Sequence, residues 1–285
     1  MAVKNTRPWL DDFVEACKKE TIHLQQPYQQ QQDYICKPVT EAGVSAEELQ
    51  SILLKNGLFE PREWRHVAKA ARHLERKGTW GVAAREYRRL KRKWQGPETA
   101  IYIFPVAQCH LPARRRAIVK SGLSFRRCLF LFLAPDVPDI EIKALLAHEY
   151  NHICRLARMG FRTDELPLKE ALVMEGLAEY AVKSLYGEEQ MSQWVKHHRG
   201  EDVRQVWKRE FVPALELSGQ ENHQPYLYGE RRGRLPEWIG YQIGYEIIDS
   251  YQRNHGEDMM QELLKKPANQ LIADSDFPLE YRKKK

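Results

Sequence analysis

The chain has 285 residues, of which 42% are hydrophobic and 29% charged, and its formal net charge is +6. This length can bury a sizeable core, and the composition is typical of a soluble globular protein with one large or two small domains. No apolar run approaches the length of a membrane span, and acidic residues occupy the opening where a signal peptide has its apolar region, so we expect a cytoplasmic protein. The five cysteines form no C-x-x-C pair, which argues against a disulfide framework or a zinc ribbon and favours buried, inert thiols.

Residues 1–97 are predicted to form a helical N-terminal region without a catalytic signature. The glutamine-rich stretch 25–34 is typical of a polar connection between helices. Ser45 and a glutamate three residues later form a capping box, which predicts that a helix begins there. Two further helices are predicted over residues 61–77 and 80–94, where a proline begins the first and a glycine separates the two.

These last two helices carry a net positive charge that exceeds that of the whole chain. Between Arg62 and Trp94 there are twelve Lys or Arg against three Glu, a local excess of nine positive charges. With the interleaved aromatic residues, this excess makes binding to nucleic acid or to an anionic surface an alternative function. Apolar residues at helical spacing, such as Val67 and Leu74, favour a packing role for the aromatics and a solvated basic face. We therefore do not expect nucleic acid to be the partner.

Two apolar stretches follow that favour strands. The first runs from about Ile101 to Phe104, and the second is Leu123 to Leu133, LSFRRCLFLFL. Pro135 then breaks the second strand. The late portion of the second strand, residues 129–133, fits an ordinary buried strand as well as it fits a strand at the edge of a sheet.

The segment LLAHEYNH, from Leu145 to His152, reads as a metal-binding helix. His148 and His152 are four residues apart, so both side chains project from one helical face and can ligate one tetrahedral ion. Glu149 then lies beside that ion as a base for its water. The alternative is a chance match in which the histidines are satisfied core residues. The apolar run that they interrupt favours the metal site, because buried imidazoles need partners.

Two ligands do not complete such a site, and the next predicted helix offers candidates for a third. It contains VMEGLAEY, in which Glu175 and Glu179 stand one turn apart on one face. From the spacing alone, either Glu175 or Glu179 could be the third ligand.

The pair HEYNH and EGLAEY resembles the gluzincin peptidases, whose third zinc ligand is a Glu on the helix after the H-E-x-x-H helix. More closely, LLAHEYNHICR, LVMEGLAEY and IGYQIGYEII resemble a family of predicted zinc-dependent proteases of unknown function, from about Ile101 to the C-terminal region. The family often carries a second His where this chain has Asn151, and both ligand positions are kept. The resemblance implies Glu175 as the third ligand and Glu179 as a hydrogen-bond acceptor that orients a ligand histidine.

The resemblance also implies a predominantly helical α+β fold of the zincin-like (gluzincin) type with a small sheet, in which residues 98–285 form the metallopeptidase domain. Residues 219–234 are predicted to form a long loop, and a helix follows from Pro236. An aromatic stripe on that helix is more often core than catalytic, yet the resemblance implies a tyrosine over the metal. Tyr241 matches that position best, with Tyr245 or His223 as alternatives.

These observations predict a zinc metallopeptidase. Zinc held by the two histidines and Glu175 keeps a fourth position for water and lowers its pKa, Glu149 takes the proton, and Tyr241 donates to the developing oxyanion. The expected partner is an extended peptide or protein substrate along strand 123–133, which the resemblance places at the sheet edge. Two alternatives stay open: a nucleic-acid or anionic-surface binding module with a structural zinc, and a zinc hydrolase of non-peptide substrates.

Overall fold

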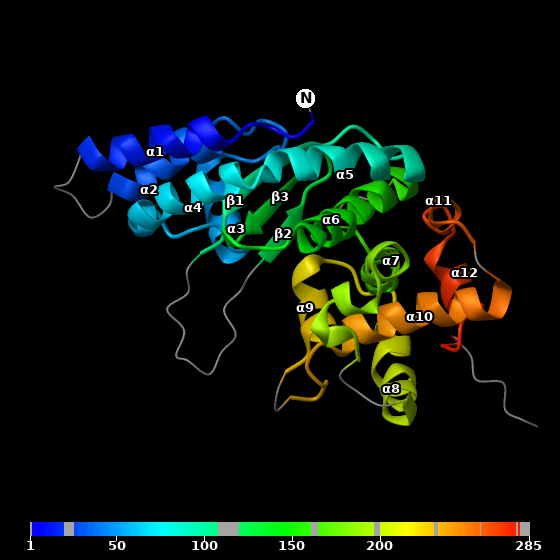
Figure 1. The fold of residues 1–285 in the computed structure, drawn as a ribbon. Coiled ribbons are helices and arrows are strands. Elements are labelled where there is room, and N and C mark those ends of the chain that lie inside the picture. The colour runs from blue at the N-terminus through cyan, green and yellow to red at the C-terminus, as the bar shows by residue number, and fades with distance from the viewer. Residues whose placement is uncertain are drawn as a thin grey trace, which may run out of the picture. The chain divides into compact units, whose positions relative to one another are not determined.

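The fold is a predominantly helical α+β arrangement with one small sheet, as predicted. The computed structural model describes residues 2–19, 26–107, 120–160, 165–196, 200–230, 233–256, 258–277 and 279. The chain forms two compact units, residues 1–92 with 96–153, and residues 93–95 with 154–285 (Figure 1). This is a division by packing, and the functional boundary at residue 97 stays a prediction.

In its described residues, the first unit contains five α-helices, three strands and most of a sixth α-helix. In chain order the elements are α1 (Arg7–Lys19), α2 (Gln26–Gln31), α3 (Ala46–Lys55), α4 (Trp64–Arg76), α5 (Thr79–Trp94), β1 (Ala100–Pro105), β2 (Lys120–Ser124), β3 (Cys128–Leu133) and α6 (Asp139–Met159). A π-helical turn, Gln32–Cys36, follows α2, and a 3₁₀ turn, Pro61–Glu63, precedes α4.

The sheet has the strand order β1-β3-β2, with β1 parallel and β2 antiparallel to β3. Every residue of β1 and of β3 is buried, so β3 is a central strand covered on both faces. One face, which includes Phe130 and Phe132, packs with apolar side chains of α1, α3 and α4. On the other face of β3, Leu131 is paired with Gly122 and Leu129 with Ser124.

The prediction of one strand over residues 123–133 was therefore wrong. The segment forms the end of β2, a turn and β3, because Arg126 and Arg127 are exposed at the turn and interrupt the apolar run. Since β3 already has a partner on each side, it has no free edge for a substrate. Of the two strands that share residues 123–133, β2 is the one that lies at an edge of the sheet in the part of the chain that the structure describes.

Helix boundaries in this unit follow the local signals, with one exception. Ser45 caps α3 and accepts a hydrogen bond from the Glu48 amide at 3.1 Å, which confirms that the helix begins there. The prediction of a polar connection over residues 25–34 was wrong, because α2 forms there and Gln31 is fully buried. The Gln31 amide donates to the Phe59 carbonyl at 2.9 Å, which satisfies its polar group inside the core.

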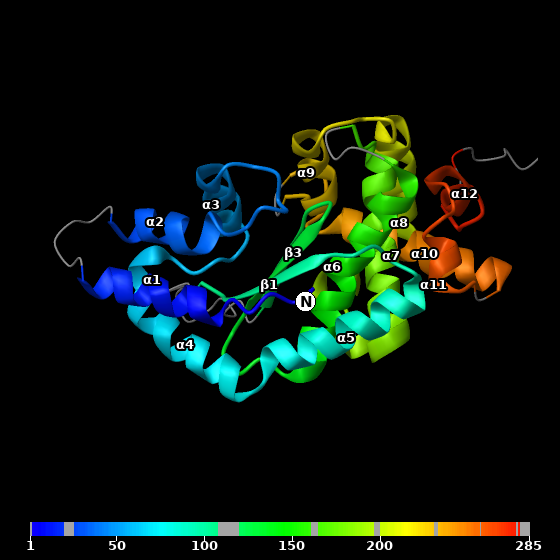
Figure 2. The same ribbon diagram turned by 90° about the horizontal axis from the view of Figure 1, so that it is seen from above.

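The basic residues of α4 and α5 form a solvent-exposed face. Figure 2 shows the two helices in succession along one margin of the unit. The exposed side chains of α4 recur at intervals of three and four residues, and α5 repeats the pattern with Arg85, Arg88 and Arg92. The tryptophans serve packing: Trp94 is buried, and the Trp80 indole donates to the Thr6 hydroxyl at 3.2 Å.

The second unit is helical in the part of the chain that the structure describes. Its longer helices are α7 (Leu168–Tyr186), α8 (Gly200–Val206), α9 (Gln220–Tyr228) and α10 (Ile239–His255), followed by α11 (Met260–Leu263) and α12 (Ala268–Ala273). Short 3₁₀ or π segments are Glu188–Gln190, Gln193–Lys196, Trp207–Phe211 and Val212–Ala214. The prediction of a long loop over residues 219–234 was wrong, since α9 occupies much of it.

Two glycines let α7 and α10 cross in backbone contact. A Cβ atom added to Gly176 would lie 2.0 Å from the Gly244 carbonyl oxygen, and one added to Gly244 would lie 2.3 Å from the Leu172 carbonyl oxygen. Neither helix can yield locally, because the obstructing atoms belong to the other backbone. Glu175 is the residue next to this crossing, so the contact sets where α7 presents it.

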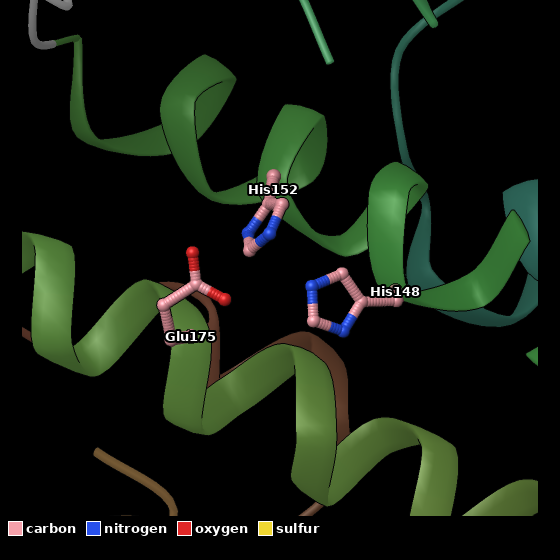
Figure 3. A group of neighbouring side chains, drawn as sticks. All are labelled: His148, His152 and Glu175. Atoms are coloured by element: carbon pink, nitrogen blue, oxygen red, sulfur yellow. The ribbon is translucent and has the colours of Figure 1, made fainter. Parts of the chain in front are cut away.

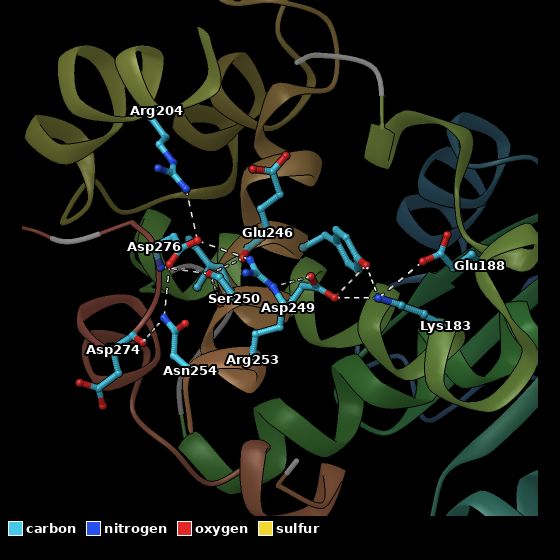
Figure 4. Close-up of polar contacts among 12 residues, drawn as sticks. Lys183, Glu188, Arg204, Glu246, Asp249, Ser250, Arg253, Asn254, Asp274 and Asp276 are labelled. Carbon is cyan, nitrogen blue, oxygen red and sulfur yellow. Dashed lines mark hydrogen bonds and ion pairs between the residues drawn. The ribbon is translucent and has the colours of Figure 1, made fainter. Parts of the chain in front are cut away.

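A polar network along α10 joins it to α7 and to the segment after α12 (Figure 4). The Lys183 ammonium donates to the Tyr245 hydroxyl at 2.9 Å and to the Asp249 carboxylate at 2.7 Å. Arg253 lies 3.4 Å from both Asp249 and Asp276. The C-terminal half of α10 therefore has a structural role, because its charged side chains hold neighbouring segments together.

Two predictions about the whole chain can be compared with this fold. No helix in the described ranges is long and apolar enough to cross a membrane. Four cysteines lie in those ranges and all four are buried, whereas Cys109 lies outside them. Burial raises the pKa of Cys36 and of Cys128 to about 12, which keeps both thiols protonated and inert.

Candidate metal centre

Helix α6 carries the two predicted histidine ligands. Pro138 precedes the helix and acidic residues stand in its first turn, where they favour the positive end of the helix dipole. Gly160, with a φ of 73°, follows its last residue. Within this helix the imidazole rings of His148 and His152 have centroids 4.7 Å apart and an interplanar angle of 87°. The four-residue spacing thus brings both rings to one face, as predicted.

Glu175 of α7 completes a group of three possible ligands (Figure 3). One ligand atom from each of His148, His152 and Glu175 can be chosen so that all lie within 4.8 Å of one another. His152 is buried and the other two are half-buried. The carboxylate that joins the histidines in this group is Glu175, not Glu179.

The chemistry of these donors fits zinc. Two imidazole nitrogens and one carboxylate oxygen are the ligand set of a catalytic zinc site, which keeps one coordination position open. A structural zinc site closes with four protein ligands, often cysteines, and the group found among the described residues has three members and no cysteine. The three residues can therefore hold a zinc ion and leave room for a reactant.

A buried ion pair ties the metal-binding helix to α7. The Arg155 guanidinium, three residues after His152, donates to the Glu170 carboxylate at 2.8 Å, and both side chains are almost fully buried. Arg155 also donates to the backbone carbonyls of Leu264 at 3.1 Å and Lys266 at 2.6 Å. Because a buried charge is tolerated only when its hydrogen bonds are made, this cluster fixes the C-terminal part of α6 against α7.

Glu149, the predicted base, is buried and held by strand β2. Its side chain is 6% exposed. The Ser124 hydroxyl lies 2.5 Å from the Glu149 carboxylate and 2.9 Å from the Glu149 carbonyl oxygen. Gly122 lies against the same side chain. Sequence reasoning missed both residues; the signal for them was the alternation of small residues in KSGLS.

Glu179 lies one turn beyond Glu175 and is buried, whereas Glu175 is half-buried. Its carboxylate accepts hydrogen bonds from the Ser192 amide at 3.0 Å and the Ser192 hydroxyl at 2.6 Å. These contacts tie α7 to the segment that follows it. The predicted hydrogen bond from a ligand histidine to Glu179 stays a prediction.

The three candidates for the oxyanion donor occupy different surroundings. Tyr241 is half-buried near the start of α10, with its ring 5.8 Å from that of Tyr228 and 5.7 Å from that of Trp238. His223 lies in α9, and its Nε2 is 2.8 Å from the Leu217 carbonyl oxygen.

Tyr245 belongs to the network between α7 and α10. Its hydroxyl accepts from Lys183 and donates to Asp249 at 3.0 Å. Burial raises the pKa of Tyr245 to about 12, with Asp249 adding to the rise and Lys183 opposing it. Both hydrogen-bonding roles of this hydroxyl are already used, which favours a structural role for Tyr245.

The fold and the three-ligand group define a zincin-like protein, and comparison with known families gives the same result. A family described as predicted Zn-dependent protease (DUF2268) matches residues 79–273, and the chain belongs to this family.

Two relatives from Bacillus subtilis (strain 168) are similar to this chain. The uncharacterized protein YjaZ is 34% identical over 179 residues, which is 62% of this chain and 68% of that protein. The uncharacterized protein YjfC is 26% identical over 124 residues, which is 40% of this chain and 41% of that protein. No solved structure matches the chain.

Proposed function

We propose that the protein is a zinc-dependent peptidase with His148, His152 and Glu175 as ligands. The observation that carries this proposal is the grouping of two imidazoles and one carboxylate in a chain of a predicted zinc-dependent protease family. Three such ligands are typical of a catalytic zinc site, which keeps its fourth position for water or substrate. Zinc, when bound there, supplies a Lewis acid that polarises a carbonyl and lowers the pKa of a water.

The side chains of this protein move protons and stabilise charge around that centre. Glu149, adjacent to His148, accepts the proton of the attacking water and returns it to the leaving amine. Tyr241 donates a hydrogen bond to the oxygen on which negative charge develops. Gly244, which touches α7 beside Glu175, supports this choice, because Tyr241 lies three residues before it on the same face of α10.

The substrate in this proposal is an extended peptide that pairs with the open edge of β2. Backbone pairing along an edge strand recognises a peptide without reference to its side chains, which suits a protease. The strand also contacts Glu149 through Ser124, so a peptide on β2 lies next to the base. A cytoplasmic location likewise stays our prediction.

Metal analysis with matched variants tests the proposal. The purified protein is expected to hold about one zinc ion per chain, and His148→Ala and Glu175→Gln are each expected to lose it. Glu149→Gln is expected to keep its zinc and its melting temperature, but to cleave a peptide library about 10²- to 10⁴-fold more slowly. Undiminished zinc in both ligand variants would remove the site, and near-normal cleavage by Glu149→Gln with full metal would remove the base.

The same experiment separates the competing functions. A structural zinc in an anionic-surface binding module predicts that zinc removal lowers stability and that no peptide is cleaved. The exposed basic side chains of α4 and α5 are the observation in favour of that reading. A zinc hydrolase of another carbonyl substrate predicts intact zinc, no peptide cleavage, and turnover of small ester or amide substrates that depends on Glu149.

A further inference from the structure

One face of β2 lies against the metal-binding helix at Glu149. Gly122 and Ser124 share that face, because alternate residues of a strand point to the same side. A Cβ atom added to Gly122 would lie 2.4 Å from the Oε1 atom of Glu149 and 2.6 Å from its Cγ and Cδ atoms. The Glu149 side chain therefore occupies the volume that any other residue at position 122 would fill.

Ser124 holds the same side chain by a hydrogen bond. Its hydroxyl is within hydrogen-bonding distance of both the carboxylate and the backbone carbonyl of Glu149. The shorter of the two contacts, 2.5 Å, is the one to Oε2 of the carboxylate, so the Ser124 hydroxyl donates its single proton there. Contacts at the carboxylate and along the side chain hold Glu149 against Gly122 and Ser124.

We propose that Gly122 and Ser124 are positioning residues, which form a seat on β2 for the general base. This inference rests on the proposed role of Glu149 as the base. The seat fixes the carboxylate relative to the helix that carries both histidines, and it does so from the strand whose edge is proposed to bind substrate. Base and substrate then share one support, so that a substrate aligned on β2 is aligned with the proton acceptor as well.

The competing explanation is that Ser124 only fastens β2 to α6. Ser121 provides the control, because it lies on the same strand with its side chain directed to the opposite face. Its hydroxyl donates to the Asn56 carbonyl at 2.7 Å, so it also makes one hydrogen bond that fastens the strand. Removing either hydroxyl deletes a hydrogen bond that fastens β2. Only the removal of the Ser124 hydroxyl also releases the Glu149 carboxylate.

The test compares Ser124→Ala, Ser124→Thr and Ser121→Ala in the zinc-loaded protein. Ser124→Ala is expected to lower kcat by about 10- to 100-fold with little change in KM, because a misplaced catalytic group costs up to about that much. Ser124→Thr keeps the hydroxyl and is expected to restore most of kcat. Ser121→Ala is expected to leave the Glu149 carboxylate in place and to lower kcat much less than Ser124→Ala does. Equal losses in the two alanine variants, or a change in KM alone, would overturn the seat.

A double variant tests whether Ser124 acts through Glu149. In the Glu149→Gln background, the additional change Ser124→Ala is expected to leave the residual rate unchanged. A further loss of the same size as in wild type would show that the hydroxyl acts elsewhere.

A structural readout keeps this inference distinct from the proposed function. Crystal structures of zinc-loaded wild type and Ser124→Ala are expected to show that the Glu149 carboxylate leaves β2 in the variant, and Gly122→Ala is expected to displace it as well. An unmoved carboxylate in Ser124→Ala would overturn the seat even in an active enzyme. If the wild type cleaves no peptide while its carboxylate lies on the seat, the proposed activity fails and the placement of Glu149 stands.

Discussion

The contact between α7 and α10 gives a prediction whose size follows from the structure. In Gly176→Ala the new methyl group would start 2.0 Å from the Gly244 carbonyl oxygen, while contacts under 3.0 Å are essentially never seen. The helices must therefore separate by at least about 1 Å at the crossing, which loosens apolar contacts along both. Overpacking of this kind costs about 1–3 kcal/mol and sometimes more.

An opposing effect has to be included. Alanine in the middle of a helix is favoured over glycine by about 1 kcal/mol. Because the separation of two long helices disturbs many contacts at once, we take the upper end of the overpacking cost, about 3 kcal/mol. Less the gain of about 1 kcal/mol, the expected net loss is about 2 kcal/mol. For a chain of this size each kcal/mol corresponds to roughly 2–4 °C, which gives a fall in melting temperature of about 4–8 °C.

Gly81→Ala is the matched control. Gly81 also lies inside a helix, but an added Cβ would meet only the flexible guanidinium of Arg85, at 3.4 Å. This variant is expected to be stabilised by about 0.5–1 kcal/mol. Calorimetry and chemical denaturation of both variants check the pair. Equal stabilisation of Gly176→Ala and Gly81→Ala would refute the close crossing. If Gly176→Ala is destabilised as expected, zinc titration of this variant shows whether the displacement of the helices also moves Glu175.

Three further predictions concern other parts of the chain. Tyr241→Phe is expected to lower kcat by about 10²- to 10³-fold at constant zinc content, whereas Tyr245→Phe is expected to lower the melting temperature and keep kcat; the reverse pattern would exchange their roles. Arg155→Met leaves its carboxylate partner buried and unpaired, so we expect a loss of about 3–5 kcal/mol in denaturant titrations, and a neutral effect would contradict the pairing. The double change Arg85→Glu and Arg88→Glu is expected to abolish any salt-dependent binding to a polyanion such as heparin without altering peptide cleavage; loss of both would argue against separate surfaces.

Features that depend on a few neighbouring residues could be predicted from the sequence. Ser45 begins α3 because its own side chain caps the helix, and Gly160 lies just beyond α6 because it can adopt a positive φ. The spacing of His148 and His152 brings the two rings together for the same reason, since both belong to one helix.

Features that depend on distant residues could not be predicted in this way. The apolar letters of 123–133 suit one long strand or a hairpin, and only the pairing of both arms decides between them. The polar side chain of Gln31 suggests an exposed position, but its burial is possible because it donates a hydrogen bond to the Phe59 carbonyl. The seat of Glu149 depends on Gly122 and Ser124, which are about 25 positions away in the chain; the small residues of KSGLS do not by themselves indicate which side chain they contact.

The hydrogen bonds of Arg155 have a consequence for the way this protein is synthesised. The guanidinium on the metal-binding helix needs the carbonyl groups of Leu264 and Lys266, which emerge from the ribosome more than one hundred residues later. Until then the helix carries a cation whose acceptors are incomplete, and its contact with α7 lacks part of its support. The C-terminal part of the metal-binding helix therefore gains its full set of hydrogen bonds only after residues 264–266 have been synthesised.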